Sequence, residues 1–467
     1  MSTSGSPELG GPASLHALER CFGGAIPAVL ATASADGVPN VTYLSKAHRV
    51  DGERIALSNQ FMSKTVRNLA VNPRASLLLI DPTDHAEYRL SIVYERTERR
   101  GHVFERLRTD IDAVAALSGM QDVFRLRAAT IFRVVDVVQV EPNPSGMLPS
   151  DLPDAREPSP DLAAVAELAA GISRCGDLDA LVDTALDGLD RLFGYALSHL
   201  LLLDEEGRRL YTVASRGFGA DSVGAEVVVG EGPVGTAAAR CEPVRIGNLL
   251  QMRKYSRSIL RQFEDNGGVR PGREVKMPEL PGTESRLIVP AVALGQLVGV
   301  LVVDSVRPVA FGVADEQVLG TVAAMLASAI EHLRALERDD DAAGAPVAAR
   351  ARDAPGTTAS PVVVRFFPVD GSTFLDSDYL IKGVAGRILW SLLRQHTSEG
   401  RVDFTNRELR LDRSLQLPGF KDNLESRLML LKRRLDERSA PVRIERTDRG
   451  RFRLLVTRPL RLSCDDD

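Results

Sequence analysis

The sequence of 467 residues holds only four cysteines, and their placement excludes a fold stabilised by disulfide bonds or by zinc. They lie far apart in the chain and form none of the Cys-x-x-Cys or Cys/His spacings that a disulfide scaffold or a zinc site requires. We therefore expect isolated, reduced thiols and predict no metal site. The four residues are Cys21, Cys175, Cys241 and Cys464.

Long apolar segments are also absent. The runs at 287–294 and 297–303 are interrupted by Pro290, Gly295 and Gly299 and are far shorter than the ~20 residues that a membrane span needs. The opening segment, MSTSGSPELGGPAS, lacks the positive charge and following apolar stretch of a secretory signal. We therefore expect a cytoplasmic protein that does not associate with a membrane.

Two stretches rich in Pro, Ala, Ser and Asp interrupt the patterned sequence, at 142–160 and 339–360, and this composition is typical of linkers. Together with a flexible tail over 1–15, they leave blocks at 16–141, 161–338 and 361–460. Each block is long enough for a core of its own. The pattern of helices and strands within the blocks predicts a multidomain α+β protein.

Charge is distributed unevenly between these blocks. Residues 361–460 carry 20 Lys+Arg and 13 Asp+Glu, a balance of +7, although the whole chain has a formal net charge of −5. A basic C-terminal block behind an acidic body indicates a region that meets an acidic partner such as nucleic acid.

The first block is patterned as a small antiparallel barrel. The segment IPAVLATASADGVPNVTYLSKAHRV holds two strand-like runs around Asp36-Gly37, which is a strong hairpin signal. Further strand-like runs follow at RIALSNQF, RASLLLIDP, EYRLSIVYERTERRG and TIFRVVDVVQVE, with helical patterns at SKTVRNLAVNP and near 104–117. Six short strands with small helical insertions predict a small closed barrel.

This order, and the segment SNQFMSKTVRNLAVNPRASLLL in particular, resembles the FMN-binding split barrel of the pyridoxamine-phosphate-oxidase-like family. The resemblance implies FMN as a cofactor, held at its phosphate by a cation and hydroxyl groups near a helix N-terminus. The matching positions are Ser63, Lys64 and Thr65 for the phosphate, and Ser58, Asn59 and Gln60 for the ribityl chain and ring edge.

Simpler interpretations of this block stay open. Ser63 could only cap the helix while Lys64 is a solvated lysine. The Arg and His set for substrate recognition in that family is not visible near the end of the barrel, so an oxidase activity is left undecided. His48, His85 and His102 keep a haem cofactor open as well, although scattered histidines are more often surface or core groups.

The second block alternates helical patterns with pairs of strands. Apolar residues at helical spacing fill 161–193, strand pairs flank the turns at 204–207 and Gly295, and an amphipathic helix covers 315–338. The motif GEGPVGTAAARCEPVRIGNL, then SRLIVPAVALGQLVGVLVVDS and DEQVLGTVAAMLASAIEHL, resembles the GAF domain. This resemblance implies an antiparallel sheet under a pocket for a small-molecule effector, whose identity the sequence does not define.

Three features of this block need interpretation. Gly230, Gly232 and Gly235 lack the Lys-Ser/Thr of a phosphate-binding loop, so we interpret them as turn residues. The insertion at 251–280 is interpreted as a lid over the pocket. The apolar stripe of the closing helix either pairs with a second copy, in a homodimer, or covers the sheet.

The third block predicts a strand, three helices and a hairpin, in that order. The second helix begins with the capping box Thr405 to Glu408, the third is PGFKDNLESRLMLLKRRLDE, and the hairpin turns at 448–450. The segment NLESRLMLLKRRLDERSAPVRIERTDRGRFRLLV resembles the recognition helix and wing of OmpR-type winged-helix effector domains. This resemblance implies a helix in the major groove of duplex DNA and a basic wing on phosphate.

The predicted DNA-binding residues are polar and basic side chains on or near the exposed side of the third helix, together with two arginines of the wing. They are Lys421, Asn423, Ser426, Arg427, Arg433, Arg434, Arg449 and Arg451. A basic helix that contacts only protein is the competing interpretation, because Asp422, Glu425, Asp436 and Glu437 dilute its charge.

The three blocks together predict a ligand- or redox-sensing transcription regulator, in which a flavin-type barrel and a GAF domain control a DNA-binding winged helix. The alternative is a flavin-dependent oxidoreductase of the pyridoxamine-phosphate-oxidase-like family with regulatory GAF and winged-helix domains. A third possibility is an adaptor that binds protein partners and neither flavin nor DNA.

Overall fold

The computed structural model describes residues 13–24, 26–44, 46–60, 62–118, 125–140, 162–204, 206–218, 222–250, 252–253, 282–343, 360–415, 417 and 424–464. The chain divides into two compact units. One is Met1–Leu162, Val228–Pro290 and Val302–Thr321, and the other is Ala163–Val227, Ala291–Leu301 and Val322–Asp467. Apart from Met252 and Arg253, the insertion predicted as a lid lies outside the described residues.

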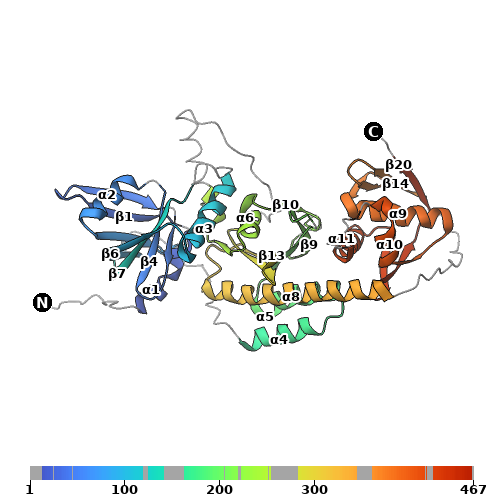
Figure 1. Ribbon diagram of the computed structural model, residues 1–467, viewed down its shortest axis with the longest axis horizontal. Helices are drawn as coiled ribbons and strands as arrows, with labels where there is room; N and C mark the ends of the chain where they lie inside the picture. The colour runs from blue at the N-terminus through green and yellow to red at the C-terminus, as the bar shows by residue number, and fades with distance from the viewer. Residues whose placement is uncertain are drawn as a thin grey trace. The chain divides into compact units, whose positions relative to one another are not determined.

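Residues 13–140 contain a seven-stranded antiparallel sheet in the order β2-β1-β5-β6-β7-β4-β3. Its curl is consistent with a split barrel, and Figure 1 shows it in blue to teal. Its strands are β1 Ala28–Ala33, β2 Pro39–Leu44, β3 Ala47–Arg49, β4 Arg54–Asn59, β5 Arg74–Ile80, β6 Glu87–Glu98 and β7 Ala128–Gln139. Its helices are α1 Ala13–Ala17, η1 Glu19–Gly23, α2 Ser63–Val71 and α3 His102–Ser118.

The sheet has one strand more than the six predicted. The run VTYLSKAHRV, expected as a single strand, divides between Leu44 and Ala47 into β2, which pairs with β1, and β3, which pairs with β4. These two strands form opposite edges of the sheet. Alternation of hydrophobic residues fixes the face of a strand but not its partner, so the sequence could not reveal this break.

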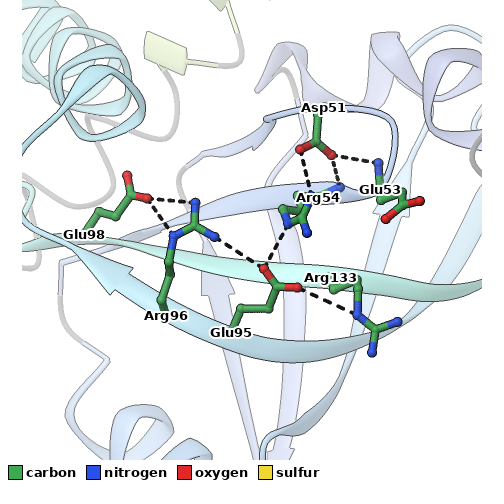
Figure 2. A network of polar contacts seen from close by, with 7 residues as sticks. All are labelled: Asp51, Glu53, Arg54, Glu95, Arg96, Glu98 and Arg133. Carbon is green, nitrogen blue, oxygen red and sulfur yellow. Dashed lines mark hydrogen bonds and ion pairs between the residues drawn. The ribbon is translucent and has the colours of Figure 1, made fainter.

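A network of ion pairs crosses β4, β7 and β6 on an exposed face of the barrel (Figure 2). Glu95 of β6 accepts a hydrogen bond of 2.9 Å from Arg54 of β4 and lies 3.7 Å from Arg133 of β7. Arg96 contacts Glu95 at 3.3 Å and Glu98 at 2.9 Å. Exposed ion pairs contribute little singly, so the network serves mainly to favour one register of the three strands.

The second sheet has six strands in the order β10-β9-β8-β13-β12-β11, which is consistent with a GAF domain. Gly207 and Gly295 occupy the predicted turns with φ of 69° and 74°. The strands are β8 Leu197–Leu203, β9 Arg209–Arg216, β10 Glu226–Val228, β11 Val244–Ile246, β12 Ser285–Ala293 and β13 Gln296–Ser305. The helices are α4 Leu162–Ser173, α5 Leu178–Phe193, α6 Gly232–Arg240 and α8 Val313–Ala343.

The glycine-rich turn before α6 has the geometry that its residue type predicts. Gly230 and Gly232 have φ of 90° and 63°, in the left-handed region that favours glycine. A Cβ on Gly235 would lie 2.2 Å from the carbonyl oxygen of Val228, so only glycine fits there. The interpretation as a turn residue is confirmed for Gly230, whereas Gly232 is the first residue of α6 and Gly235 lies within that helix.

One helix in the described part of the chain, Val313–Leu336 within α8, is apolar and long enough to cross a membrane by length and composition. Its fully buried residues recur at helical spacing, at Leu319, Val322, Leu326 and Ile330. A single buried stripe of this kind is the pattern of a helix that packs one face into a protein core.

The C-terminal block, residues 360–464, contains the predicted helices and hairpin. Thr405 Oγ1 accepts a hydrogen bond of 3.2 Å from the Glu408 backbone and Glu408 accepts one of 3.1 Å from the Thr405 backbone, so the capping box is confirmed. The strands are β14 Val362–Phe367, β15 Ser372–Leu375, β16 Asp378–Ile381, β17 Asp403–Thr405, β18 Val442–Asp448, β19 Arg451–Val456 and β20 Leu460–Cys464. The helices are α9 Gly383–Glu399, α10 Asn406–Leu411, η2 Arg413–Leu415 and α11 Leu424–Glu437.

The two ends of the C-terminal block meet in one sheet. The last strand, β20, pairs in parallel with β14, so that a four-stranded sheet forms in the order β16-β15-β14-β20. A second sheet, in the order β17-β19-β18, carries the hairpin. Apolar side chains of α9 and α11, including Leu389, Leu392, Leu431 and Leu435, form the core of the block.

Candidate functional site

The barrel contains a hollow of about 240 Å³ beside the N-terminus of α2, where β4 ends and β7 begins. We call it the barrel hollow. Its apolar lining consists of Met62, Val66 and Ala128. Its polar lining consists of Asn59, Ser63, Thr97, Arg99 and Arg127.

Positive charge is concentrated at the barrel hollow. Arg99 and Arg127 line it, and Lys64 lies exposed next to Ser63 in the first turn of α2. In the described part of the chain, none of these three cations has an ion-pair partner. The helix begins after Met62, whose side chain forms no capping hydrogen bond. Cations that are not paired with carboxylates, beside a helix N-terminus without a side-chain cap, attract an anion.

The six residues predicted for the cofactor are divided between two environments. Asn59 and Ser63 line the hollow. Ser58 instead accepts a hydrogen bond of 3.2 Å from the backbone of Lys46, because successive side chains of β4 point to opposite faces. Thr65 is buried and accepts a hydrogen bond of 3.1 Å from the Asn40 side chain.

The remaining two predicted residues lie at the start of α2 or just before it. Gln60 is 5% exposed, and its Nε2 atom has no hydrogen-bond partner among the described residues. Lys64 is exposed on α2. Ser63 is the first residue of the helix and not its cap, so the alternative in which Ser63 caps α2 is not found.

Sequence reasoning missed Arg99 and Arg127. The backbone N–H of Arg127 donates a hydrogen bond of 2.9 Å to the carbonyl of Asn59, because β7 pairs with β4 and Ala128 lies opposite Asn59. The sequence held a clue, since Arg99 lies near the end of one predicted strand and Arg127 lies three residues before another. The pairing that brings them to Asn59 joins segments about 70 residues apart and could not be derived from local pattern.

A buried ion pair lies on the other side of β4. Lys46 Nζ is 3.3 Å from Asp110 Oδ2 of α3, and both side chains are less than 8% exposed. Burial alone would raise the pKa of Asp110, but the charges of Lys46 and Arg106 outweigh it and hold that pKa below its ordinary value. Burial lowers the pKa of His48 on β3 to about 4, so this imidazole is neutral near pH 7.

The other histidines and the cysteines offer no metal site in the described residues. His85 is in the turn after β5 and His102 is the first residue of α3, and no group of three His, Cys, Asp or Glu residues is arranged to hold a metal there. Burial raises the pKa of Cys21 to about 12, which makes it an inert thiol.

The described DNA-binding candidates are exposed on the hairpin, buried within the C-terminal block, or in contact with the GAF half of the unit. Arg449 and Arg451 are exposed at the hairpin of β18 and β19. Arg434 is buried within the C-terminal block, where its Nε donates a hydrogen bond of 3.2 Å to the carbonyl of Leu380. Lys421 and Asn423 lie outside the described residues.

The other three predicted residues of α11 contact the GAF half of the same compact unit. The guanidinium of Arg427 lies 4.3 Å from the ring centre of Tyr211, and Ser426 accepts a hydrogen bond of 3.2 Å from Arg334. Arg433 forms an ion pair of 2.7 Å with Asp183 of α5. In this arrangement these side chains are engaged with protein.

Comparison with known proteins identifies two of the three blocks. Residues 15–134 match the family model described as pyridoxamine 5'-phosphate oxidase, and residues 175–331 match the model described as GAF domain. A stretch of 50 residues, 10% of the chain, is 40% identical to an uncharacterized protein of Methanocaldococcus jannaschii. The match spans 34% of the length of that relative.

Solved structures resemble the same two blocks. The GAF domain of an Acinetobacter phosphoenolpyruvate-protein phosphotransferase is 25% identical, with 38% of this chain and 95% of that chain covered and a TM-score of 0.31. An FMN-binding protein from Syntrophomonas wolfei is 17% identical, with 28% of this chain and 90% of that chain covered and a TM-score of 0.24. The family matches support a sensory or flavin-related protein.

Proposed function

We propose that the protein is a flavin-responsive transcription regulator. In this proposal the barrel hollow holds the phosphate end of FMN, the GAF domain takes a further small-molecule effector, and the C-terminal block binds duplex DNA. The observation that carries the proposal is the set of cations without ion-pair partners in the described residues, Lys64, Arg99 and Arg127, around the N-terminus of α2.

The residues at the barrel hollow fit the phosphate and ribityl part of a flavin. A phosphate requires cations and hydroxyl or backbone donors, which Arg99, Arg127 and Ser63 supply. Asn59 offers an amide for the ribityl hydroxyls. A hollow of 240 Å³ lies below the ~300–1,000 Å³ of pockets that enclose a whole drug-sized ligand, so it would take only part of the flavin.

The lining of the hollow favours binding over turnover. Among the described residues that line it there is no carboxylate, imidazole or thiol that could act as a general acid or base. A bound flavin would supply the redox chemistry, while the residues of the chain bind and orient it. This supports a sensor over the alternative of an oxidoreductase.

The C-terminal block supports the DNA-binding part of the proposal through the order of its elements and through its charge. Helices α9, α10 and α11 are followed by the hairpin of β18 and β19, which is the order of a winged helix. Exposed arginines on this hairpin could meet phosphate, and they are Arg443, Arg446, Arg449, Arg451 and Arg453.

We also propose a homodimer. Strand β2 lies at an edge of the barrel sheet and exposes Val41 and Tyr43, which are 62% and 75% accessible. A second copy that covered this edge would bury both side chains. Sedimentation of the wild-type chain and of Tyr43→Asp tests it, and a wild-type monomer at micromolar concentration would refute it.

The test of the flavin site is an absorbance spectrum of the purified protein, followed by titration of the apoprotein with FMN. We expect bands near ~450 nm, or saturable FMN binding where the cofactor was lost during purification. DNA binding is tested separately, by fluorescence anisotropy with a labelled duplex at two salt concentrations. Affinity should fall steeply as salt rises, because phosphate contacts release counterions. Absence of FMN binding would refute the first part, and absence of duplex binding at low salt would refute the second.

A further inference from the structure

The face of α11 that lies outside its own core is covered. The core stripe of this helix is Leu424, Leu428, Leu431 and Leu435, at helical spacing. Two further apolar residues, Met429 and Leu430, lie off this stripe and yet are only 4% exposed each. A DNA-reading face would present polar side chains to water, so buried apolar residues at these positions indicate a protein contact.

The covering residues belong to α5 and to the strand pair β8–β9, in the same compact unit as α11. Leu430 shares a small crevice with Leu202, Tyr211 and Val213. Arg427 lies over the ring of Tyr211 at 4.3 Å, which is a cation–π contact. The apolar part of the contact is therefore formed by Leu430 of α11, which also belongs to the core of the C-terminal block, together with residues of β8 and β9.

The charged part of the contact is formed by two acidic residues of α5, which we call the acidic pair. Asp179 and Asp183 are four residues apart on one helix and so share a face. Lys432 Nζ lies 2.8 Å from Asp179 Oδ2, and Arg433 lies 3.3 Å from Asp179 Oδ1 and 2.7 Å from Asp183 Oδ1. The two carboxylates therefore hold two of the four cations of α11, Lys432 and Arg433.

We propose that this contact is an intramolecular inhibitory latch, which rests on the DNA-binding function proposed above. Asp179 and Asp183 bind Lys432 and Arg433 where DNA phosphates would bind these cations. Tyr211 of β9 covers Arg427. One cation cannot pair closely with a carboxylate and a phosphate in the same place, so duplex DNA and the sensor compete for α11. The ion pairs are partly exposed and individually weak, which lets the latch open reversibly.

The closed contact is tested without DNA by zero-length crosslinking of the full chain. A carbodiimide activates a carboxylate, and a neighbouring amine then forms an amide with it. We expect a crosslinked peptide that joins Lys432 to Asp179, identified by mass spectrometry and lost in Lys432→Arg. Failure to find this crosslink in the wild-type chain at low salt, with other Lys–acid crosslinks present, would overturn the proposal.

The inhibition is tested with a matched pair of double variants of the full chain. Asp179→Asn with Asp183→Asn removes the acidic pair. Asp187→Asn with Asp190→Asn changes the net charge equally on the same helix, but these residues contact Arg216 and not α11. We expect the first variant to bind a labelled duplex at least ~fivefold more tightly than the second, since coupling of this kind is typically five- to 150-fold.

If the two double variants bind the duplex with equal affinity, the proposal that the acidic pair inhibits DNA binding is overturned. Fluorescence of Trp390, which stacks on Phe366 inside the C-terminal block, reports whether each variant is folded. A wild-type chain and variants that all fail to bind duplex at low salt would overturn the DNA-binding function together with the latch. The crosslink between Lys432 and Asp179 would then still show whether α11 contacts α5.

Discussion

Arg99 and Arg127 are the residues on which the flavin assignment depends most. Both line the barrel hollow, and in the described part of the chain neither is neutralised by a carboxylate. Among the residues predicted from sequence, Asn59 and Ser63 also line the hollow. Asn59 is the last residue of β4 and Ser63 is the first residue of α2, and local sequence patterns indicate both of these ends. The two arginines depend on the pairing of β4 with β7, which no local pattern specifies.

Replacing these arginines should weaken FMN binding. A charge-assisted hydrogen bond to a phosphate contributes about 1.5–3 kcal/mol, so Arg99→Gln and Arg127→Gln should each raise the Kd for FMN by roughly tenfold or more. The measurement is a fluorescence titration of FMN into each variant. Arg133→Gln is the matched control, because Arg133 belongs to the ion-pair network of Figure 2 and not to the hollow. Wild-type affinity in both hollow variants would refute the site.

His48 should make the stability of the barrel depend on pH. Its pKa is lowered by burial to about 4 in the folded state, against 6.5 for an ordinary histidine. Between these values the unfolded chain binds a proton that the folded chain does not, so stability falls as pH decreases from about 6.5 to about 4. The lowered pKa of Asp110 acts in the same direction, but only at more acidic pH. The loss due to His48 should be on the order of 2–3 kcal/mol.

The measurement is urea unfolding at several pH values, followed by a short hydrogen-exchange pulse at one fixed pH. Hydrogen exchange in the peptides of β3 and β4 reports the unfolding of the barrel. His48→Gln cannot take up the proton, so the midpoint for this variant should change much less between pH 6.5 and 4.5. The same pH dependence in the variant and in the wild type would assign the effect to other groups.

Among the secondary-structure elements, features that depend on neighbouring residues could be predicted from the sequence, and features that depend on distant strands could not. The Thr405 capping box and the turns at Gly207 and Gly295 depend on residues within a few positions, and each was predicted correctly. The division into β2 and β3 and the return of β20 to β14 depend on distant strands, and neither was predicted. The run LMLLK in α11 was a signal of a covered face, since it places apolar residues off the core stripe.

The capping box should contribute measurably to the C-terminal block. Thr405→Ala removes one half of it and should lower the free energy of unfolding by about 1 kcal/mol. Trp390 is the only tryptophan of the chain and is packed against the core of this block, so its fluorescence follows unfolding there. Thr397→Ala is the control, because Thr397 Oγ1 bonds only the Leu393 carbonyl of its own helix. Equal losses in the two variants would show that the capping geometry adds nothing specific.

At the scale of the whole molecule, the proposal requires that a ligand in the barrel change the DNA affinity of the C-terminal block. A ligand shifts an equilibrium only when it binds two states with different affinity. The structure has Lys432 and Arg433 on the acidic pair. The proposed latch adds a second state, in which both cations bind DNA. The contact joins helices about 250 residues apart. Local sequence patterns indicate a sensor and a basic C-terminal block, but they do not specify a contact over this distance.

The most direct test of the regulator is the affinity of the full chain for a selected DNA duplex, measured by fluorescence anisotropy with FMN saturating and with FMN removed. We expect the two values of Kd to differ at least ~fivefold, which corresponds to a coupling free energy of about 1 kcal/mol. The double variant Arg99→Gln with Arg127→Gln should show no such difference at the same FMN concentration. Equal affinity of the wild-type chain in both conditions, with FMN binding demonstrated, would contradict the account.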